Sequence, residues 1–189
     1  MVYDLIVIGG GQAGIAAAVA AGRMQVKTLL IEKYGFCGGM ATAARVNPFA
    51  GNCYVNPRTG NAGDAIEGIF QEVLQLLKNK NATQRYFFSK TTKSFYDSFE
   101  EEKLKIVYDE MLATSNVTVL YHTSLVSVSA LSNHIESIKV INKSGLQELK
   151  AKYFIDSTGD ADLAAMSGVA FEVGRKEDGL CQPCTLMFR

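Results

Sequence analysis

The stretch DLIVIGGGQAGIAAA, residues 4–18, decides the fold of this chain. An apolar run, typical of a strand buried on both faces of a parallel sheet, leads directly into glycines. Gly9, Gly11 and Gly14 have the spacing G-x-G-x-x-G, and small apolar residues suited to a helix follow them. The first glycine permits a tight turn, the second lets a pyrophosphate approach the backbone, and the third lets the helix pack on the strand. The start of the helix would add free N–H groups that favour phosphate.

The sequence after this motif strengthens it, since a glycine-rich turn alone is also common in protein cores. Residues 27–31 (KTLLI) predict a second buried strand, and Glu32 follows it. A strand, turn, helix and strand within about 30 residues form a βαβ unit. A carboxylate at the end of the second strand can accept both hydroxyls of a ribose. The sequence therefore predicts a dinucleotide site, and Glu32 disfavours an NADP-type ligand because it would repel a 2′-phosphate.

The rest of the chain predicts further helices and strands. Asp64 can cap a helix with apolar residues at helical spacing, and Ser98 with Glu101 forms a capping box before another helix. Residues 48–96 are expected to form a helical insertion or cap. Three other stretches have strand patterns: 117–121, an antiparallel meander over 125–149, and 153–155. The predicted fold class is α/β, a Rossmann-like parallel sheet with a β-meander crossover and this insertion.

Composition and charge exclude several classes of protein. The 189 residues are 48% hydrophobic and 20% charged with a formal net charge of zero, which is ordinary for one globular domain. No cluster of Lys and Arg favours nucleic acid or a membrane surface, and no apolar run is long enough to span a bilayer. Asp4 stands where a signal peptide would carry basic residues. A cytoplasmic protein with reduced thiols is expected.

Three separated motifs resemble a known superfamily. They are the glycine motif, EKYGFCGGMAT at residues 32–42, and YFIDSTGDAD at residues 153–162. In this order they resemble the FAD-binding domain of glutathione-reductase-type flavoproteins. Within that group, GGMAT and the closing motif G-R-x-x-D-G-x-x-Q-P-x-T-L-M-F-R, residues 174–189, are similar to the FAD-dependent oxidoreductase family. That family is related to the flavoprotein subunits of heterodisulfide reductase and fumarate reductase.

The resemblance implies FAD as the cofactor and a role for each motif. The three glycines of the first loop would contact the pyrophosphate and Glu32 the adenosine ribose. The loop after Glu32 would line the phosphate and ribityl region, Val126 would meet the adenine through its backbone, and the turn at 157–160 would close over the cofactor. The residues expected to contact FAD are Gly9, Gly11, Gln12, Ala13, Gly14, Glu32, Lys33, Gly38, Gly39, Met40, Thr42, Val126, Ser157, Thr158, Gly159 and Asp160.

The expected activity is flavin-mediated hydride transfer on a small-molecule substrate, with no metal, nucleic-acid or membrane partner. Two alternatives stay open, an NAD-binding dehydrogenase without flavin and a non-catalytic dinucleotide-binding fragment. The resemblance implies that residues 1–189 form the N-terminal FAD-binding part of a larger enzyme, in which 174–189 begin the substrate region and no catalytic residue is identified. A sheet without its last strand would expose an edge and favour a homo-oligomer.

The cysteines allow more than one interpretation. Cys181-Gln-Pro-Cys184 is a C-x-x-C, which suits a redox pair, half of a metal site, or two buried thiols. The sequence has no second C-x-x-C, and neither histidine has the spacing of a metal ligand. Cys37 adjoins the GG pair, where a thiol near the flavin and a small core thiol are both consistent with the sequence.

Overall fold

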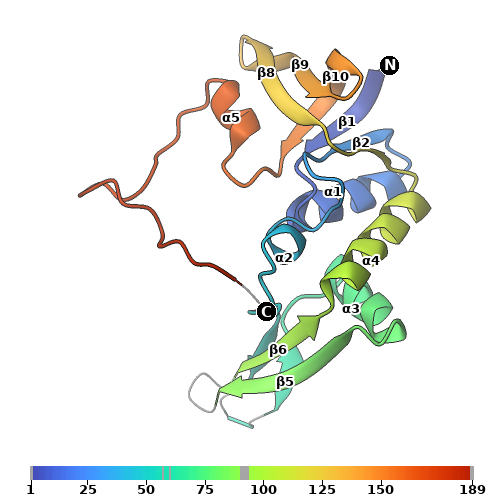
Figure 1. Ribbon diagram of the computed structural model, residues 1–189, viewed down its shortest axis with the longest axis vertical. Helices are drawn as coiled ribbons and strands as arrows, with labels where there is room; N and C mark the ends of the chain where they lie inside the picture. Colours follow the sequence, from blue (N-terminus) through green and yellow to red (C-terminus); the bar gives the residue numbers. More distant parts are fainter. Residues whose placement is uncertain (1, 57, 60, 90–93, 188–189) are drawn as a thin grey trace.

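The computed structural model describes residues 2–56, 58–59, 61–89 and 94–187 of the chain (Figure 1). Its elements follow in the order β1 (Val2–Ile8), α1 (Gln12–Arg23), β2 (Thr28–Ile31), α2 (Met40–Ala43), β3 (Cys53–Val55), β4 (Ala62–Asp64), α3 (Ile69–Asn79), β5 (Thr83–Ser89), β6 (Ser94–Phe99), α4 (Glu101–Thr114), β7 (Thr118–Leu120), β8 (Ser124–Leu131), β9 (His134–Asn142), β10 (Gly145–Asp156) and α5 (Asp162–Met166). No described helix has both the length and the apolar character needed to cross a membrane.

The main sheet confirms the predicted α/β class. Its six strands have the order β7-β2-β1-β10-β9-β8. The first four are parallel to one another, whereas β9 runs antiparallel to both β10 and β8. β1, α1 and β2 form the predicted βαβ unit, in which Leu5 lies opposite Thr28 and Ile8 opposite Ile31.

The strand β10 joins two features that the sequence pattern separates. Residues 145–149 pair antiparallel with β9 and complete the meander, while residues 150–156 pair parallel with β1. The predicted meander and the predicted strand at 153–155 are therefore one continuous strand of 12 residues. No glycine or proline interrupts the chain between Leu146 and Ile155, so nothing in the local sequence requires a break.

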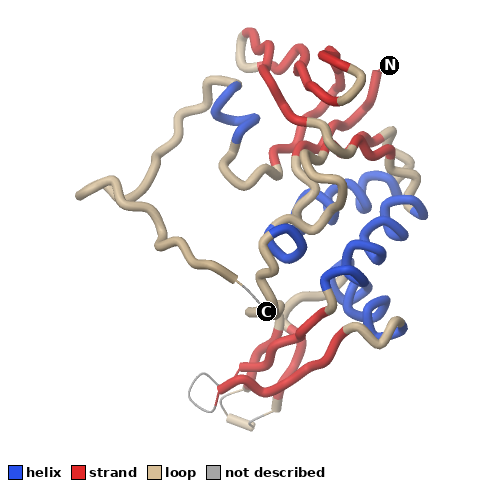
Figure 2. Tube along the Cα trace, viewed as in Figure 1, coloured by secondary structure: helices blue, strands red, loops and turns tan. Residues whose placement is uncertain are grey.

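Two apolar layers cover the two faces of the parallel strands. Alternate residues of β1 enter different layers because successive side chains of a strand point to opposite faces. Leu5 and Val7 pack in the layer beneath α1, α3 and α4, whereas Ile6 and Ile8 pack in the layer with β9 and α5. Helices α1, α3 and α4 accordingly lie together beside the sheet (Figure 2).

The insertion at 48–96 is not mainly helical, and this part of the prediction is wrong. It contains the expected helix α3, but also the hairpins β3–β4 and β5–β6. A two-stranded hairpin needs no continuous apolar face, and a register shift between Phe87 and Ser89 further breaks the alternation. The polar and aromatic residues of β5 and β6 therefore lack the period by which strands are recognised.

The two predicted helix caps are also wrong. Asp64 lies in β4, and the N-cap of α3 is Gly68, whose φ of 68° favours glycine. Ser98 lies in β6, where its hydroxyl donates to the backbone oxygen of Gln84 at 3.1 Å. Helix α4 instead begins after Glu100, which makes no side-chain cap. Both Asp64 and Ser98 pair with a neighbouring strand, so neither is available to cap a helix.

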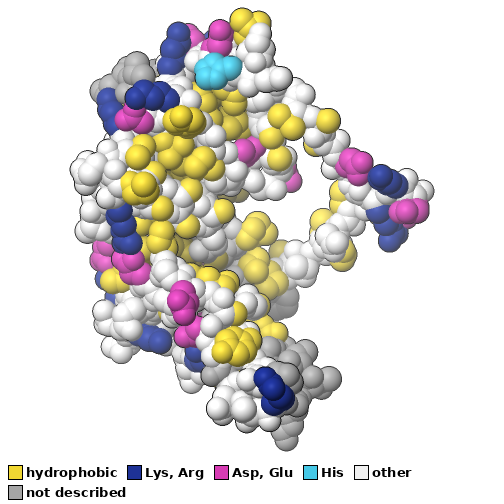
Figure 3. Space-filling model, turned by 180° about the vertical axis from the view of Figure 1, so that it is seen from behind, with side chains coloured by type: hydrophobic (Ala, Val, Ile, Leu, Met, Phe, Trp, Pro, Cys, Tyr) yellow, Lys and Arg dark blue, Asp and Glu magenta, His cyan; other side chains and the backbone are white. Residues whose placement is uncertain are grey.

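Residues 169–187 form an exposed arm without helix or strand. The arm leaves the sheet after α5 and curves back toward the insertion (Figure 1). In the space-filling view it stands apart from the body, with charged side chains at its bend (Figure 3). Phe188 and Arg189, the last residues of the closing sequence motif, lie outside the described residues.

Candidate functional site

The glycine loop, residues 9–14, lies at the carboxyl end of β1, and β2 and β10 end on either side of it. The strand that follows β1 in the parallel sheet, β2, lies on one side of β1, whereas β10 lies on its other side. The order of the strands in the sheet therefore changes direction at β1. Open α/β sheets bind ligands at such a switch point, outside the carboxyl ends of their strands.

The three glycines of the motif have different surroundings. A Cβ at Gly14 would lie 1.9 Å from the carbonyl oxygen of Gly9, and a Cβ at Gly9 would lie 2.4 Å from the carbonyl oxygen of Ser157. Both positions are therefore closed to any other residue by the protein itself. A Cβ at Gly11 would meet no atom within 4 Å, and its φ of −74° suits any residue. Space for a ligand thus lies at Gly11.

The start of α1 is suited to an anion. Gly11 is the N-cap of α1, no side chain caps the helix, and its first turn holds no acidic residue. Gln12 and Ala13 are exposed. The first N–H groups of a helix have no partner within the helix and carry about half a positive charge between them. A pyrophosphate placed against Gly11 would supply the acceptors that these groups lack.

Glu32 connects the end of β2 to the glycine loop. Its side chain is 5% exposed, and its two oxygens accept hydrogen bonds from the N–H groups of Gly10, at 2.7 Å, and Tyr34, at 2.8 Å. Each carboxylate oxygen has a further lone pair with which it can accept a ribose hydroxyl. Lys33 is exposed, and its ammonium lies 5.2 Å from the centre of the Tyr34 ring.

The loop with Gly38 and Gly39 packs directly onto the glycine loop. The N–H of Gly38 donates to the carbonyl of Gly10 at 2.8 Å, and a Cβ at Gly39 would lie 3.0 Å from the Cα of Gly11. Both residues have positive φ, 119° and 55°, which favours glycine. The hydroxyl of Thr42 donates to the carbonyl of Cys37 at 2.9 Å and holds the loop closed, while Met40 is exposed.

A hydrogen-bonded chain of side chains supports these two loops from α4. The phenol of Tyr108 donates to Oε1 of Gln12, and Nε2 of Gln12 donates to the carbonyl of Gly38 at 3.5 Å. Tyr108 is buried, and burial raises its pKa, so the phenol keeps its proton and acts as a donor. The sequence contains no signal for this contact, because 96 positions separate Tyr108 from Gln12.

The third motif forms a turn after β10. Ser157 donates from its N–H to the carbonyl of Ile8 at 2.8 Å, which fastens the turn to β1. Asp156 accepts from the N–H and hydroxyl of Thr158, at 2.9 and 2.7 Å, and from the N–H of Ala164, at 2.8 Å. Gly159 and Asp160 are exposed. Asp156 is absent from the predicted set, although the D-x-T pattern of an Asx turn is readable in the sequence.

Val126 lies near the start of β8, a few residues after the chain contacts Glu32. Thr123 donates from its N–H to the carbonyl of Glu32 at 3.0 Å, just before β8 begins. The pairing of β8 with β9 shifts register between Leu125 and Ser127, and Val126 has no assigned partner there. Its side chain is 44% exposed. The backbone of Val126 is thus in an irregular part of the ladder.

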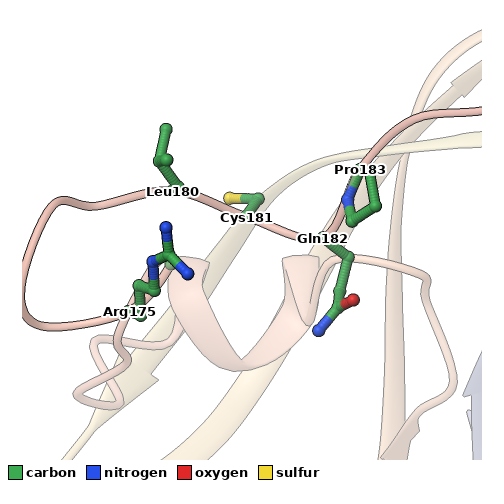
Figure 4. Close-up of a pocket in the computed structure, with 6 residues that line it drawn as sticks. Arg175, Leu180, Cys181, Gln182 and Pro183 are labelled. Atoms are coloured by element: carbon green, nitrogen blue, oxygen red, sulfur yellow. The ribbon is translucent and has the colours of Figure 1, made fainter.

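Cys37 belongs to the core beneath these loops. Its side chain is buried, and burial raises the pKa of the thiol to about 12. A protonated, enclosed thiol is a small core residue and not a nucleophile. The described residues contain no group of three or more His, Cys, Asp and Glu side chains that could hold a metal. An open pocket does occur in the arm, but only arm residues line it (Figure 4).

Sequence comparison finds relatives of greater length. The tRNA uridine 5-carboxymethylaminomethyl modification enzyme MnmG of Sulfurihydrogenibium sp. is 29% identical over 182 residues, 93% of this chain and 28% of that protein. The mitochondrial dihydrolipoyl dehydrogenase of Schizosaccharomyces pombe is 26% identical over 179 residues, 90% of this chain and 30% of that protein. The chain therefore spans less than a third of either relative.

Structural comparison and a family model agree with the fold and the motifs. A flavoprotein/dehydrogenase from Cytophaga hutchinsonii superposes with a TM-score of 0.62 at 18% identity, over 93% of this chain and 44% of that one. The sequence model of the family described as FAD dependent oxidoreductase matches residues 4–189. This match covers nearly the whole chain and includes all three motifs. The chain belongs to the FAD dependent oxidoreductase family, and its cofactor is FAD.

Proposed function

We propose that the loops at residues 9–14, 32–42 and 156–160 bind FAD, which serves in hydride transfer on a small-molecule substrate. The observation that carries this proposal is the open space at Gly11, inside a loop whose other two motif glycines are closely packed. The protein's own packing does not require a glycine there, whereas a pyrophosphate lying on the backbone does. When bound, FAD supplies the isoalloxazine ring that accepts or donates hydride.

Each part of the proposed site has donors or acceptors that suit one part of FAD. The uncapped start of α1, with Gly9, Gly11, Gln12, Ala13 and Gly14, would hold the pyrophosphate, and Glu32 would accept the ribose hydroxyls. The other predicted residues would contact the rest of the cofactor. The ribityl chain would lie near Lys33, Gly38, Gly39, Met40 and Thr42, and the adenine near Val126. The turn that would close over the cofactor consists of Ser157, Thr158, Gly159 and Asp160.

The same observations favour FAD over the two alternatives. A site for NAD alone would not need the glycine pair Gly38-Gly39 soon after Glu32. The family match also concerns FAD-dependent enzymes. A small-molecule substrate is proposed because the net charge is zero, which provides no general attraction to nucleic acid. We further propose a cytoplasmic location, with which the four free cysteines are consistent.

The test compares cofactor binding by the wild-type chain and by Gly11→Ala. The purified protein is expected to release FAD, and an FAD titration of the cofactor-free protein should show saturable binding. Gly11→Ala should weaken FAD binding roughly tenfold or more, because its methyl group would occupy the space of the pyrophosphate. Its thermal stability without cofactor should fall only slightly, because the methyl meets no protein atom and the one cost is that of alanine at an N-cap.

Ala113→Ser provides a control. Ala113 is exposed on the last turn of α4. This end of α4 lies beside Gly22, which is at the far end of α1 from the glycine loop. Its FAD affinity should equal that of the wild type. Binding of NAD but not FAD, or an unchanged FAD affinity in Gly11→Ala, would contradict the proposed function.

A further inference from the structure

Cys181 and Cys184 lie in the arm, outside the proposed FAD site, and their thiols differ from the other two. All four cysteines are free, but only Cys181 and Cys184 are exposed. Cys37 is buried with a pKa of about 12. Cys53 is partly buried, its Sγ lies 3.9 Å from a carboxylate oxygen of Asp64, and burial raises its pKa. The thiols open to a reagent in solution are therefore the two of the C-x-x-C.

The chain in front of Cys181 is held in a closed turn. The N–H of Gly179 donates to the carbonyl of Arg175 at 2.8 Å, and the N–H of Arg175 donates to the carbonyl of Leu180 at 3.1 Å. The guanidinium of Arg175 makes two hydrogen bonds to Asp178, at 2.7 and 2.6 Å. Figure 4 shows Cys181 directly after this turn, with no labelled side chain covering its sulfur. Cys181 thus directly follows a turn that is closed by hydrogen bonds.

The chain after Cys181 is free to bend. Within the described arm, no residue from Cys181 to Met187 belongs to a helix or strand, and no hydrogen bond holds this stretch. Three residues fully extended cover about 10 Å, whereas a disulfide requires Cα atoms about 4.4–6.8 Å apart. A bend at Gln182 and Pro183 closes this difference. Pro183 already has a fixed φ, so less conformational entropy is lost when the ring forms.

We propose that Cys181 and Cys184 form a reversible disulfide, with a low-molecular-weight disulfide such as oxidised glutathione as the oxidant. The thiolate of one cysteine attacks a sulfur of oxidised glutathione, which forms a mixed disulfide and releases one glutathione. The second cysteine attacks the mixed disulfide, which forms the protein disulfide and releases the second glutathione. Two protein thiols are oxidised, one small disulfide is reduced, and the two cysteine protons pass to the released glutathione molecules.

The consequence is a change in the arm and not in the FAD site. The disulfide would tie the free stretch after Cys181 to the closed turn before it, and so fix the direction in which the arm continues. A disulfide in a cytoplasmic protein is usually transient and serves catalysis or redox sensing. This inference does not depend on FAD binding, because none of its steps involves FAD.

The experiment treats the folded chain with excess oxidised glutathione and measures its intact mass, then alkylates the remaining thiols and measures peptide masses. The wild type is expected to lose the mass of two hydrogen atoms and to yield one peptide in which Cys181 and Cys184 are linked. Dithiothreitol should restore the original mass. Cys37 and Cys53 should not be linked to any other cysteine, and Cys53→Ser should form the same disulfide as the wild type.

Two variants separate the steps of the exchange. Cys184→Ser should retain one glutathione on Cys181, because no second thiol can displace it, and Cys181→Ser should retain one on Cys184. Both cysteines are exposed, so neither change should affect folding. Wild-type protein that keeps glutathione on both cysteines, forms disulfides between chains, or does not react would overturn the proposal.

Discussion

The carboxylate of Glu32 accepts a hydrogen bond from the N–H of Gly10 at 2.7 Å, across 22 positions of the chain. Its second oxygen accepts from the N–H of Tyr34 at 2.8 Å. The residue that the sequence motif assigns to the cofactor ribose therefore also joins β2 to the glycine loop. Substitutions at Glu32 must accordingly be assessed for both binding and stability.

Glu32→Gln is expected to weaken FAD binding by roughly tenfold to a hundredfold. The amide keeps one acceptor oxygen but loses the charge, and hydrogen bonds to charged groups contribute about 1.5–3 kcal/mol each. Fluorescence titration of the cofactor-free protein with FAD would measure the affinity. Glu110→Gln makes the same chemical change on an exposed part of α4 and should bind FAD like the wild type. Equal affinity in both variants would disprove the role in ribose binding.

Gly14→Ala is expected to destabilise the protein more than Gly11→Ala does. The Cβ at position 14 would lie 1.9 Å from the carbonyl oxygen of Gly9, so α1 must move away from the loop. Forced overpacking of this kind lowers the free energy of unfolding by about 1–3 kcal/mol, whereas alanine at position 11, an N-cap with free space, should cost less than about 1 kcal/mol. Urea denaturation without cofactor compares the two. Equal stabilities would show that Gly14 is not a packing position.

Tyr108→Phe is expected to weaken FAD binding about twofold to tenfold, because Gln12 loses the donor that orients it. Gln12 is itself exposed, so water can replace the phenol and stability should change little. Isothermal calorimetry with FAD and thermal unfolding of the cofactor-free protein would separate the two effects. Tyr153→Phe removes a hydroxyl from an exposed tyrosine and is the control. A loss of stability without a loss of affinity would refute the positioning role.

Asp97→Asn is expected to lower the free energy of unfolding by about 2–3 kcal/mol. Asp97 is fully buried and accepts two hydrogen bonds from Arg85, at 2.9 and 2.8 Å, and one from Asn52 at 2.5 Å. Breaking a fully buried ion pair costs about 3–5 kcal/mol, and Arg85 is partly exposed. Glu110→Gln, which breaks an exposed pair, should cost less than about 1 kcal/mol. Chemical denaturation that finds equal losses would contradict this assignment.

Cys37 is expected to resist alkylation between about pH 7 and pH 9. Its raised pKa, about 12, means that the thiolate appears only as the pH approaches that value, so the neutral thiol predominates below it. Iodoacetamide should modify Cys37 at least roughly a hundredfold more slowly than the exposed Cys181 in the folded protein. Mass spectrometry over time would follow both. In urea the two rates should become similar, and similar rates in the folded protein would contradict the burial of Cys37.

The sequence alone predicted the βαβ unit and the residues of its glycine loop. These features depend on local chemistry: an apolar strand, glycines at fixed spacing and a carboxylate after the second strand. It also predicted the meander and the core helices through their apolar patterns. Asp156 is absent from the predicted residues, although its Asx-turn pattern is local and is visible in the sequence.

Other features depend on contacts between distant residues, which no local pattern records. Ser98 and Asp64 have the chemistry of helix caps, but pairing within the hairpins places both in strands. Strand β10 is continuous because its first part pairs with β9 and its last part pairs with β1. Tyr108 meets Gln12 only because α4 packs beside α1. The sequence determined the βαβ unit and its glycine loop, and the tertiary structure decided which distant residues hold that loop in position, because packing joins residues that the chain keeps far apart.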